Sequence, residues 1–281
     1  MNGETAVYGV IGKPVSHSLS PQIHGYLAEL CGLNMAYLPF YVEEESVPEA
    51  IRGAMALGIS GLNVTVPHKK AVMPFLAEID PMAERVGAVN TLVRTEGGYV
   101  GHNTDYIGIQ RSVQSAGFSF AGQKVVVLGA GGSAYAACVA AADQGAAGIT
   151  IINRSRERAV SLASHINSNY NIPAIVSSEI SPGADIMIQT TTLGFGEMAE
   201  RSPVLDLRVF EGLRLAFDII YAPWETVFLR QARQAGVPMA INGFPMLVYQ
   251  AIAAFQLWHK TASIQNEEEH IKILSSRLHA H

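Results

Sequence analysis

The feature that most constrains the fold is a glycine-rich turn between an apolar strand and a helix of small residues. Residues 125–128 are apolar, and the sequence GAGGSA follows them at 129–134. Glycines let the backbone turn tightly and approach a phosphate, while the N–H groups and dipole of the following helix favour negative charge. The turn therefore predicts a doubly wound, Rossmann-like sheet that binds the pyrophosphate of a dinucleotide.

The spacing of this turn is GxGGxA rather than the usual GxGxxG, and alanine in the third place is small enough for close helix packing. A tight turn that binds nothing is the competing interpretation, which the strand before it and the helix after it disfavour. The residues predicted to contact the pyrophosphate are Gly129, Ala130, Gly131, Gly132, Ser133 and Ala134.

A basic segment, NRSRER at 153–158, follows the next predicted strand, where an NAD-binding fold usually offers an acid to the ribose. A carboxylate there would repel a 2′-phosphate, whereas guanidinium groups pair with it. The competing interpretation, a solvated basic helix start, is disfavoured by the glycine turn upstream. NADP is therefore the predicted cofactor, with Asn153, Arg154, Ser155 and Arg158 as further binding residues.

Periodicity predicts an α/β protein of two domains with a cleft between them. In the first domain we expect a mixed sheet, with strands at 6–11, 36–42 and 62–66, helices at 20–31 and 47–57, and a hairpin over 89–101. In the second we expect strands at 125–128, 149–152, 186–189 and 215–219 and helices at 133–143, 155–167 and 225–235. The predicted substrate domain is 1–105, completed by C-terminal helices within 243–281, and the predicted NADP domain is 106–242.

Composition and charge exclude several classes of partner. The 281 residues are 49% hydrophobic and carry a net charge of -5, so a nucleic acid is not expected to bind. The sequence contains neither a signal peptide nor an apolar run of about 20 residues, which predicts a cytoplasmic protein without a membrane partner. Cys31 and Cys138 have no spacing suited to zinc, and no metal is expected.

Neutral hydroxyl and amide groups gather beside predicted strand ends, where α/β sheets place ligands. The clusters are residues 16–20, 63–69, 90–91 and 103–105. Ser20 is expected to cap a helix with Pro21 at its first position, and His68 is interpreted as a turn residue. Many neutral donors and acceptors with few charges suit a small polyol substrate.

Reducing a ketone with a nicotinamide requires a proton donor for the developing alkoxide. None of the ten tyrosines has a lysine four residues later, the arrangement found in short-chain dehydrogenases. Lys69 and Asp105 are the charged members of otherwise neutral clusters and form the predicted acid/base pair. The sequence does not say whether they lie close in space.

Together these segments resemble the shikimate dehydrogenase family, from Gly9 to about His259. The motifs, in order, are GKPVSHSLSPQIH, GLNVTVPHKK, GAVNTL, GHNTD, GAGGSA, INRS, DIIYAPWET and NGFPMLVYQA. The resemblance implies reversible, NADPH-dependent reduction of 3-dehydroshikimate to shikimate, in aromatic amino acid biosynthesis. It also implies that the N-terminal domain and a returning C-terminal helix bind shikimate, while the central domain binds the nucleotide.

The resemblance also assigns roles to single residues. Ser18 and Ser20 would hold the substrate carboxylate, and Tyr221 would lie near the nicotinamide and that carboxylate. The residues implied to contact the substrate hydroxyls are Thr65, Lys69, Asn90, Asp105 and Gln250. Thr191 and Gly243 complete the predicted cofactor-binding set.

Some positions depart from the family pattern, and two alternatives stay open. Thr192 and Phe195 stand where proline and methionine are usual, and the ring of Phe195 would change the contact with the nicotinamide. A quinate/shikimate dehydrogenase using NAD is one alternative, although Ser20 and Arg154 point away from it. The other is a non-catalytic NADP-binding sensor, which the presence of Lys69 and Asp105 disfavours. The sequence also leaves open a homodimer and whether the tail after Thr261 is helical.

Overall fold

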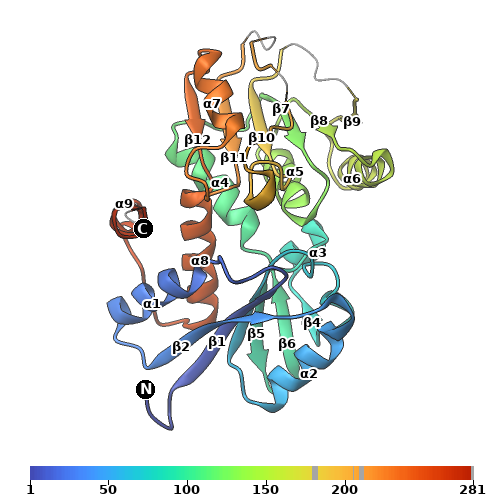
Figure 1. Ribbon diagram of the computed structural model, residues 1–281. Coiled ribbons are helices and arrows are strands. Elements are labelled where there is room, and N and C mark those ends of the chain that lie inside the picture. Colours follow the sequence, from blue (N-terminus) through green and yellow to red (C-terminus); the bar gives the residue numbers. More distant parts are fainter. Residues whose placement is uncertain (179–182, 205, 209–211, 280–281) are drawn as a thin grey trace. The chain divides into compact units, whose positions relative to one another are not determined.

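The computed structural model describes residues 1–178, 183–204, 206–208 and 212–279 (Figure 1). The chain divides into two compact units, which we call the first unit (Met1–Ile107 with Val248–His270) and the second unit (Gly108–Leu247 with Ile271–His281). The described residues form one six-stranded sheet in each unit. The predicted α/β class, with one mixed and one parallel sheet, is confirmed.

The sheet of the first unit has the strand order β2-β1-β3-β5-β6-β4. Its strands are β1 (Ala6–Gly12), β2 (Met35–Tyr41), β3 (Gly61–Val64), β4 (Glu78–Ile79), β5 (Thr91–Thr95) and β6 (Gly98–His102). Strand β1 pairs in parallel with β2 and β3, whereas β5 is antiparallel to β3 and β6. The carboxyl ends of β1, β2 and β3 therefore share one edge, and the loops after them bring polar side chains to it.

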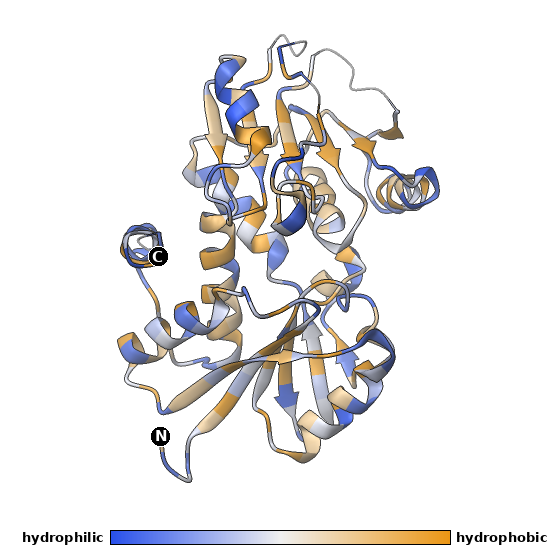
Figure 2. Ribbon diagram, in the orientation of Figure 1, coloured by the Kyte–Doolittle hydropathy of each residue, from blue (hydrophilic) through white to orange (hydrophobic). Residues whose placement is uncertain are grey.

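Alternation along β1 assigns the two faces of this sheet. Ile11 shares a core cluster with Val47 and Ile51 of α2 (Val47–Ala56). Tyr8 and Val10, on the other face, belong to a cluster that Trp258 joins. The helical elements that contribute residues to this unit are α1 (Ser20–Cys31), α3 (Pro81–Val86), α4 (Asp105–Ser115), α8 (Phe244–Trp258) and α9 (Glu267–Leu278), with 3₁₀ turns at Glu44–Ser46 and Met73–Phe75. Figure 2 shows α8 as mostly apolar, in agreement with the burial of most of its residues.

The sheet of the second unit has the order β12-β11-β10-β7-β8-β9, and all its pairings are parallel. Counted within the unit, this is the 3-2-1-4-5-6 order of a dinucleotide-binding sheet. The strands are β7 (Lys124–Leu128), β8 (Gly148–Ile152), β9 (Ala174–Val176), β10 (Ile186–Gln189), β11 (Leu215–Asp218) and β12 (Met239–Ile241). The connecting helices are α5 (Gly132–Asp143), α6 (Arg156–Asn169) and α7 (Val227–Gln234), with a 3₁₀ turn at Gly196–Met198. The doubly wound sheet predicted from the glycine turn is confirmed.

Several elements differ from the sequence-based expectations. The strands β4, β9 and β12 are only two or three residues long, too short to show the alternation by which strands are recognised. The N-cap predicted at Ser20 is wrong, because α1 begins at Ser20 and Leu19 precedes it without a side-chain cap. The Ser18 hydroxyl instead accepts a hydrogen bond from the backbone N–H of Ser20 at 3.2 Å. The tail, left open above, forms α9 with Leu274 buried.

Candidate active site

Lys69 and Asp105 lie together in the first unit, beside the carboxyl ends of its central strands. Lys69 is in the turn that follows β3, and Asp105 is the first residue of α4. The ammonium group of Lys69 forms an ion pair with Asp105 Oδ2, and only 13% and 6% of the two side chains are exposed. Two residues that are 36 apart in the sequence thus form a largely buried charged pair at a strand end.

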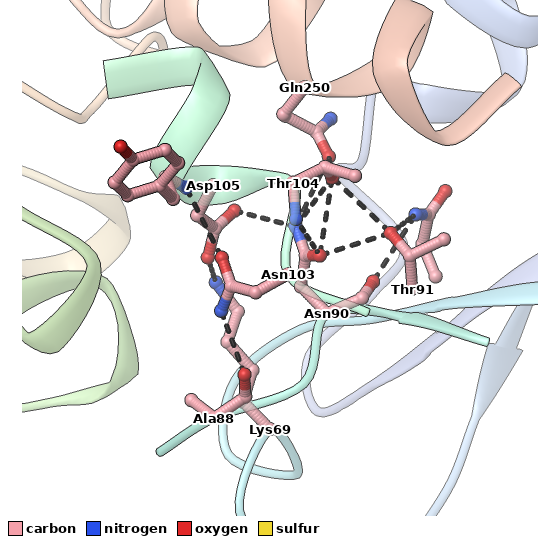
Figure 3. Close-up of polar contacts among 10 residues, drawn as sticks. Lys69, Ala88, Asn90, Thr91, Asn103, Thr104, Asp105 and Gln250 are labelled. Atoms are coloured by element: carbon pink, nitrogen blue, oxygen red, sulfur yellow. Dashed lines mark hydrogen bonds and ion pairs between the residues drawn. The ribbon is translucent and has the colours of Figure 1, made fainter. Parts of the chain in front are cut away.

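Asn90 holds the other oxygen of the Asp105 carboxylate (Figure 3). Its Nδ2 donates to Asp105 Oδ1 at 2.8 Å, and its Oδ1 accepts from the backbone N–H of Thr104 at 2.7 Å. Because a backbone N–H only donates, the orientation of the Asn90 amide is determined. Gln250 on α8 lies in the same group, with its Oε1 3.5 Å from Asn90 Nδ2. Four predicted site residues are therefore in contact, although their positions in the chain are far apart.

The predicted carboxylate-binding serines and Thr65 lie at the same edge of this sheet. Ser18 and Ser20 follow β1, and Thr65 follows β3, its parallel neighbour. The backbone N–H of Thr65 donates to the Ile11 carbonyl at 2.9 Å, which ties the start of the loop after β3 to the end of β1. His68, interpreted from the sequence as a turn residue, is fully buried and its ring bonds the Val42 carbonyl at 2.8 Å.

The glycine turn of the second unit has the backbone that its sequence predicts. Gly129 has φ +120°, and a Cβ there would lie 2.3 Å from Thr190 Oγ1, so only glycine fits. Gly131 is the N-cap of α5, and a Cβ added to it would meet no atom within 4 Å. Open space at the start of a twelve-residue helix suits a phosphate held by backbone N–H groups. Ala134 is fully buried, as close packing of the helix on the sheet requires.

The basic segment after β8 is exposed beside this turn. The backbone N–H of Gly129 donates to the Ile152 carbonyl at 2.8 Å, which places the end of β8 next to the first glycine. Ser155 caps α6 by accepting from the Arg158 N–H at 3.4 Å. Arg154 and Arg158 are exposed, and neither pairs with a carboxylate in the part of the chain that the structure describes. Both guanidinium groups are thus available to a phosphate.

Two buried residues that sequence reasoning missed shape the loops after β10 and β11. Gln189 and Asp218 lie opposite each other in the register of these strands, and both are fully buried. Gln189 Oε1 accepts from the N–H of Thr191 at 2.5 Å, and its Nε2 donates to the Leu193 carbonyl at 2.7 Å. A polar residue ending an otherwise apolar strand was the signal available in the sequence.

Asp218 closes the loop that carries Tyr221. Its carboxylate accepts from the Ile220 N–H at 3.0 Å and from the Thr226 hydroxyl at 2.6 Å. Burial raises the pKa of this carboxyl to about 7, against the lowering effect of both hydrogen bonds. Gly243 packs on the same loop, since a Cβ there would lie 1.9 Å from the Ile219 carbonyl oxygen. Tyr221 belongs to the second unit.

The second unit has a parallel sheet in the order described above and an open glycine turn. These features place the chain in the class of dinucleotide-binding α/β proteins. Residues 10–92 match the model of the shikimate dehydrogenase substrate binding domain, and residues 111–201 match that of shikimate / quinate 5-dehydrogenase. The chain belongs to the shikimate dehydrogenase family, and the resemblance seen in the sequence is confirmed.

Individual relatives support the same assignment. The chain is 43% identical over 256 residues to the shikimate dehydrogenase (NADP(+)) of Bacillus mycoides, covering 90% of this chain and 92% of that protein. A crystal structure of a shikimate dehydrogenase in complex with NADP+ superposes with a TM-score of 0.87 at 35% identity, covering 97% and 96% of the two chains. The shikimate 5-dehydrogenase of Thermus thermophilus, in complex with NADP(H) and shikimate, gives 0.84 at 32% identity, covering 95% and 98%.

Proposed function

We propose that the protein catalyses the reversible, NADPH-dependent reduction of the ketone of 3-dehydroshikimate to the alcohol of shikimate. It is an oxidoreductase acting on a CH–OH group, as its NADP-dependent relatives are. The observation that supports this reaction most directly is the Lys69–Asp105 pair, which places a buried cation among neutral amides and hydroxyls. A site with one cation among amides and hydroxyls suits a small polyol that must gain one proton at a defined oxygen.

In this proposal the Lys69 side chain donates or accepts the proton, and Asp105 orients the Lys69 side chain. As the carbonyl carbon gains a hydride, its oxygen develops negative charge, and Nζ of Lys69 donates a proton or stabilises that charge. In the reverse direction the neutral amine accepts the hydroxyl proton. Asp105 keeps Nζ in place through one oxygen and is itself held by Asn90 through the other.

The substrate contacts are also part of the proposal. Ser18 and Ser20 bind the carboxylate, since hydroxyls give directional hydrogen bonds without a permanent cation. The other substrate-binding residues are Thr65, Asn90, Gln250 and Tyr221. Residues 1–105 with the helices of 243–281 form the substrate domain, and residues 106–242 form the NADP domain.

NADP fits the second unit, because an open glycine turn lies there beside two exposed arginines that have no carboxylate partner among the described residues. When bound, the cofactor supplies the hydride. Gly129 to Ala134 would hold its pyrophosphate and Arg154 and Arg158 its 2′-phosphate, with Thr191 and Gly243 as further cofactor-binding residues. Asn153 and Ser155 shape the segment that presents the arginines, since Asn153 Nδ2 donates to the Ser155 carbonyl at 2.9 Å.

A substrate-by-cofactor assay tests the proposal. Purified protein is offered 3-dehydroshikimate with NADPH or NADH, and shikimate or quinate with NADP or NAD. We expect turnover with 3-dehydroshikimate and NADPH to exceed every other combination. Turnover with quinate and NAD of equal size would instead make the protein a quinate/shikimate dehydrogenase, and NADPH binding without turnover would make it a sensor.

We also propose a cytoplasmic location, where the free thiols of Cys31 and Cys138 would stay reduced. No helix among the described residues is long and apolar enough to cross a membrane. Cell fractionation with detection of the protein tests the location. Light scattering during size-exclusion chromatography decides between a monomer of 30.1 kDa and the homodimer that the sequence leaves open.

A further inference from the structure

A line of buried polar side chains continues from Asp105 through Asn90 to Thr91 (Figure 3) and on to Asn63 and Tyr37. The Tyr37 hydroxyl donates to Asn63 Oδ1 at 2.7 Å, and Asn63 Nδ2 donates to Thr91 Oγ1 at 3.0 Å. Thr91 Oγ1 donates to Asn90 Oδ1 at 3.0 Å, and Asn90 Nδ2 donates to Asp105 Oδ1 at 2.8 Å. We call these five residues the donor chain, because each donates to the next and the last accepts.

Backbone groups determine the direction of the donor chain. Asn63 Nδ2 also donates to the Asn90 carbonyl at 3.2 Å, and Asn90 Oδ1 accepts from the Thr104 N–H. A carbonyl only accepts and a backbone N–H only donates, so neither amide can be reversed without leaving buried groups unpaired. Since Asn63 donates to Thr91, the hydroxyl proton of Thr91 is directed to Asn90, whose Oδ1 is nearer than the Thr104 hydroxyl at 3.3 Å.

Because the hydrogen bonds of the donor chain are buried, they constrain the geometry of the Lys69–Asp105 pair. All five residues are buried, and Thr91 is completely inaccessible. The Tyr37 ring stacks on His24 with a centroid distance of 4.3 Å, which holds its hydroxyl in place. Burial also raises the pKa of Tyr37 well above its usual range, opposed by a hydrogen bond with Ser20, so the phenol stays a neutral donor. In such a setting an unmade hydrogen bond is costly, and the side chains hold one arrangement.

We infer that Tyr37, Asn63 and Thr91 are positioning residues for the Lys69–Asp105 pair, acting through the Asn90 amide. Their hydrogen bonds lead to the pair through Asn90. Their effect is to keep Asn90 Nδ2 directed at Asp105, so that the carboxylate presents its second oxygen to Lys69. This inference rests on the proposed function, since it matters for catalysis only if the pair performs the proton chemistry.

The test uses two variants that remove a hydroxyl and keep the shape of the side chain. Thr91→Val removes the proton that holds Asn90, and we expect kcat to fall about tenfold, with the KM for NADPH unchanged. Thr91→Ser restores the hydroxyl and should return kcat to within about threefold of the native enzyme. Tyr37→Phe acts one residue further away and should lower kcat about threefold to fivefold.

Tyr99→Phe is the matched control. Tyr99 is buried in the same unit, and its hydroxyl donates to the Ile59 carbonyl at 2.7 Å, outside the donor chain. It should lower Tm about as much as Tyr37→Phe and leave kcat within about twofold. The inference is overturned if Thr91→Val and Tyr37→Phe also keep kcat within twofold, since their hydroxyls would then be structural only.

Two further measurements in the same assay separate this inference from the proposed function. If the native protein has no turnover, the proposed function fails. If the native protein turns over and Lys69→Ala does not, while the donor-chain variants keep native kcat, only the inference fails. If Thr91→Val does not fold, comparing kcat of Tyr37→Phe with kcat of Tyr99→Phe still tests the inference.

Discussion

The two units each bury an aspartate at a strand end, and they balance its charge differently. Asp105 in the first unit pairs with Lys69 and accepts from Asn90. Asp218 in the second unit accepts only from neutral donors, the Ile220 N–H and the Thr226 hydroxyl, and no cation pairs with it among the described residues. A buried carboxylate with a cation can remain charged beside a substrate, whereas one without a cation binds a proton more readily. We conclude that the first arrangement suits chemistry and the second suits loop shape.

Removing the charge of Lys69, the partner of Asp105, should have the largest effect on activity. Lys69→Ala should lower kcat by roughly two to four decades and alter the KM for shikimate much less, because its interaction strengthens in the transition state. Lys69→Met keeps the stem without the charge and should behave alike. Steady-state kinetics with 3-dehydroshikimate and NADPH measure both. Near-normal turnover with weak shikimate binding would instead make Lys69 a binding residue.

Asp218 in the second unit should make the free energy of unfolding depend on pH. The pKa of Asp218 is raised from 3.8 to about 7, so between about pH 4 and pH 7 the native state binds more protons than the unfolded state. The free energy of unfolding therefore falls as pH rises through this range. Asp218→Asn lacks this titration; its Oδ1 can still accept from the Ile220 N–H, and its Nδ2 can donate to the Thr226 hydroxyl. Its stability relative to the native protein should rise by up to about 4 kcal/mol from pH 4 to 7 and level off above.

Denaturant unfolding of Asp218→Asn and the native protein at several pH values measures this difference. Asp206→Asn is a control, because Asp206 is held by Arg208 at the surface and its pKa is lowered instead. A stability difference that is constant from pH 4 to 7 would show that Asp218 is not protonated in the native state.

The exposed cations of the second unit should act on the cofactor alone. Arg154→Ala should weaken NADPH binding by roughly one to two decades, since a charge-assisted contact to phosphate is worth about 1.5 to 3 kcal/mol. NADH binding should hardly change. Arg156→Ala removes another exposed cation from the same segment and serves as the control. Fluorescence titration measures the affinities, and equal losses for both cofactors would remove the 2′-phosphate assignment.

The smallest effect is expected for a single hydroxyl of the first unit. Ser18→Ala should raise the KM for shikimate about threefold to tenfold, as loss of one hydrogen bond with a net value of about 1 kcal/mol predicts. NADP binding should stay the same. Ser16→Ala, an exposed serine in the same turn, is the control. If Ser18→Ala lowers Tm with kinetics intact, the bond from the Ser20 N–H is the whole role of this hydroxyl.

The sequence by itself determined the features that depend on neighbours along the chain. Hydrophobic periodicity located the long strands and helices, and the turn at 129–134 predicted a glycine backbone that the positive φ of Gly129 bears out. The basic segment after β8 was visible for the same reason. Motifs in order also predicted the family, which the matches over residues 10–92 and 111–201 confirm.

Only the tertiary structure decided which polar groups meet. Asn90 lies within reach of Gln250, 160 residues later, and Tyr37 bonds Asn63, 26 residues later. No local pattern encodes such pairs, because they depend on which strands become neighbours and on the register between them. The same holds for Asp218, whose raised pKa follows from burial, and for Ser20, where a hydrogen bond to Ser18 replaced the expected cap. Burial and partner choice are properties of the folded chain, since both arise only when distant segments exclude water together.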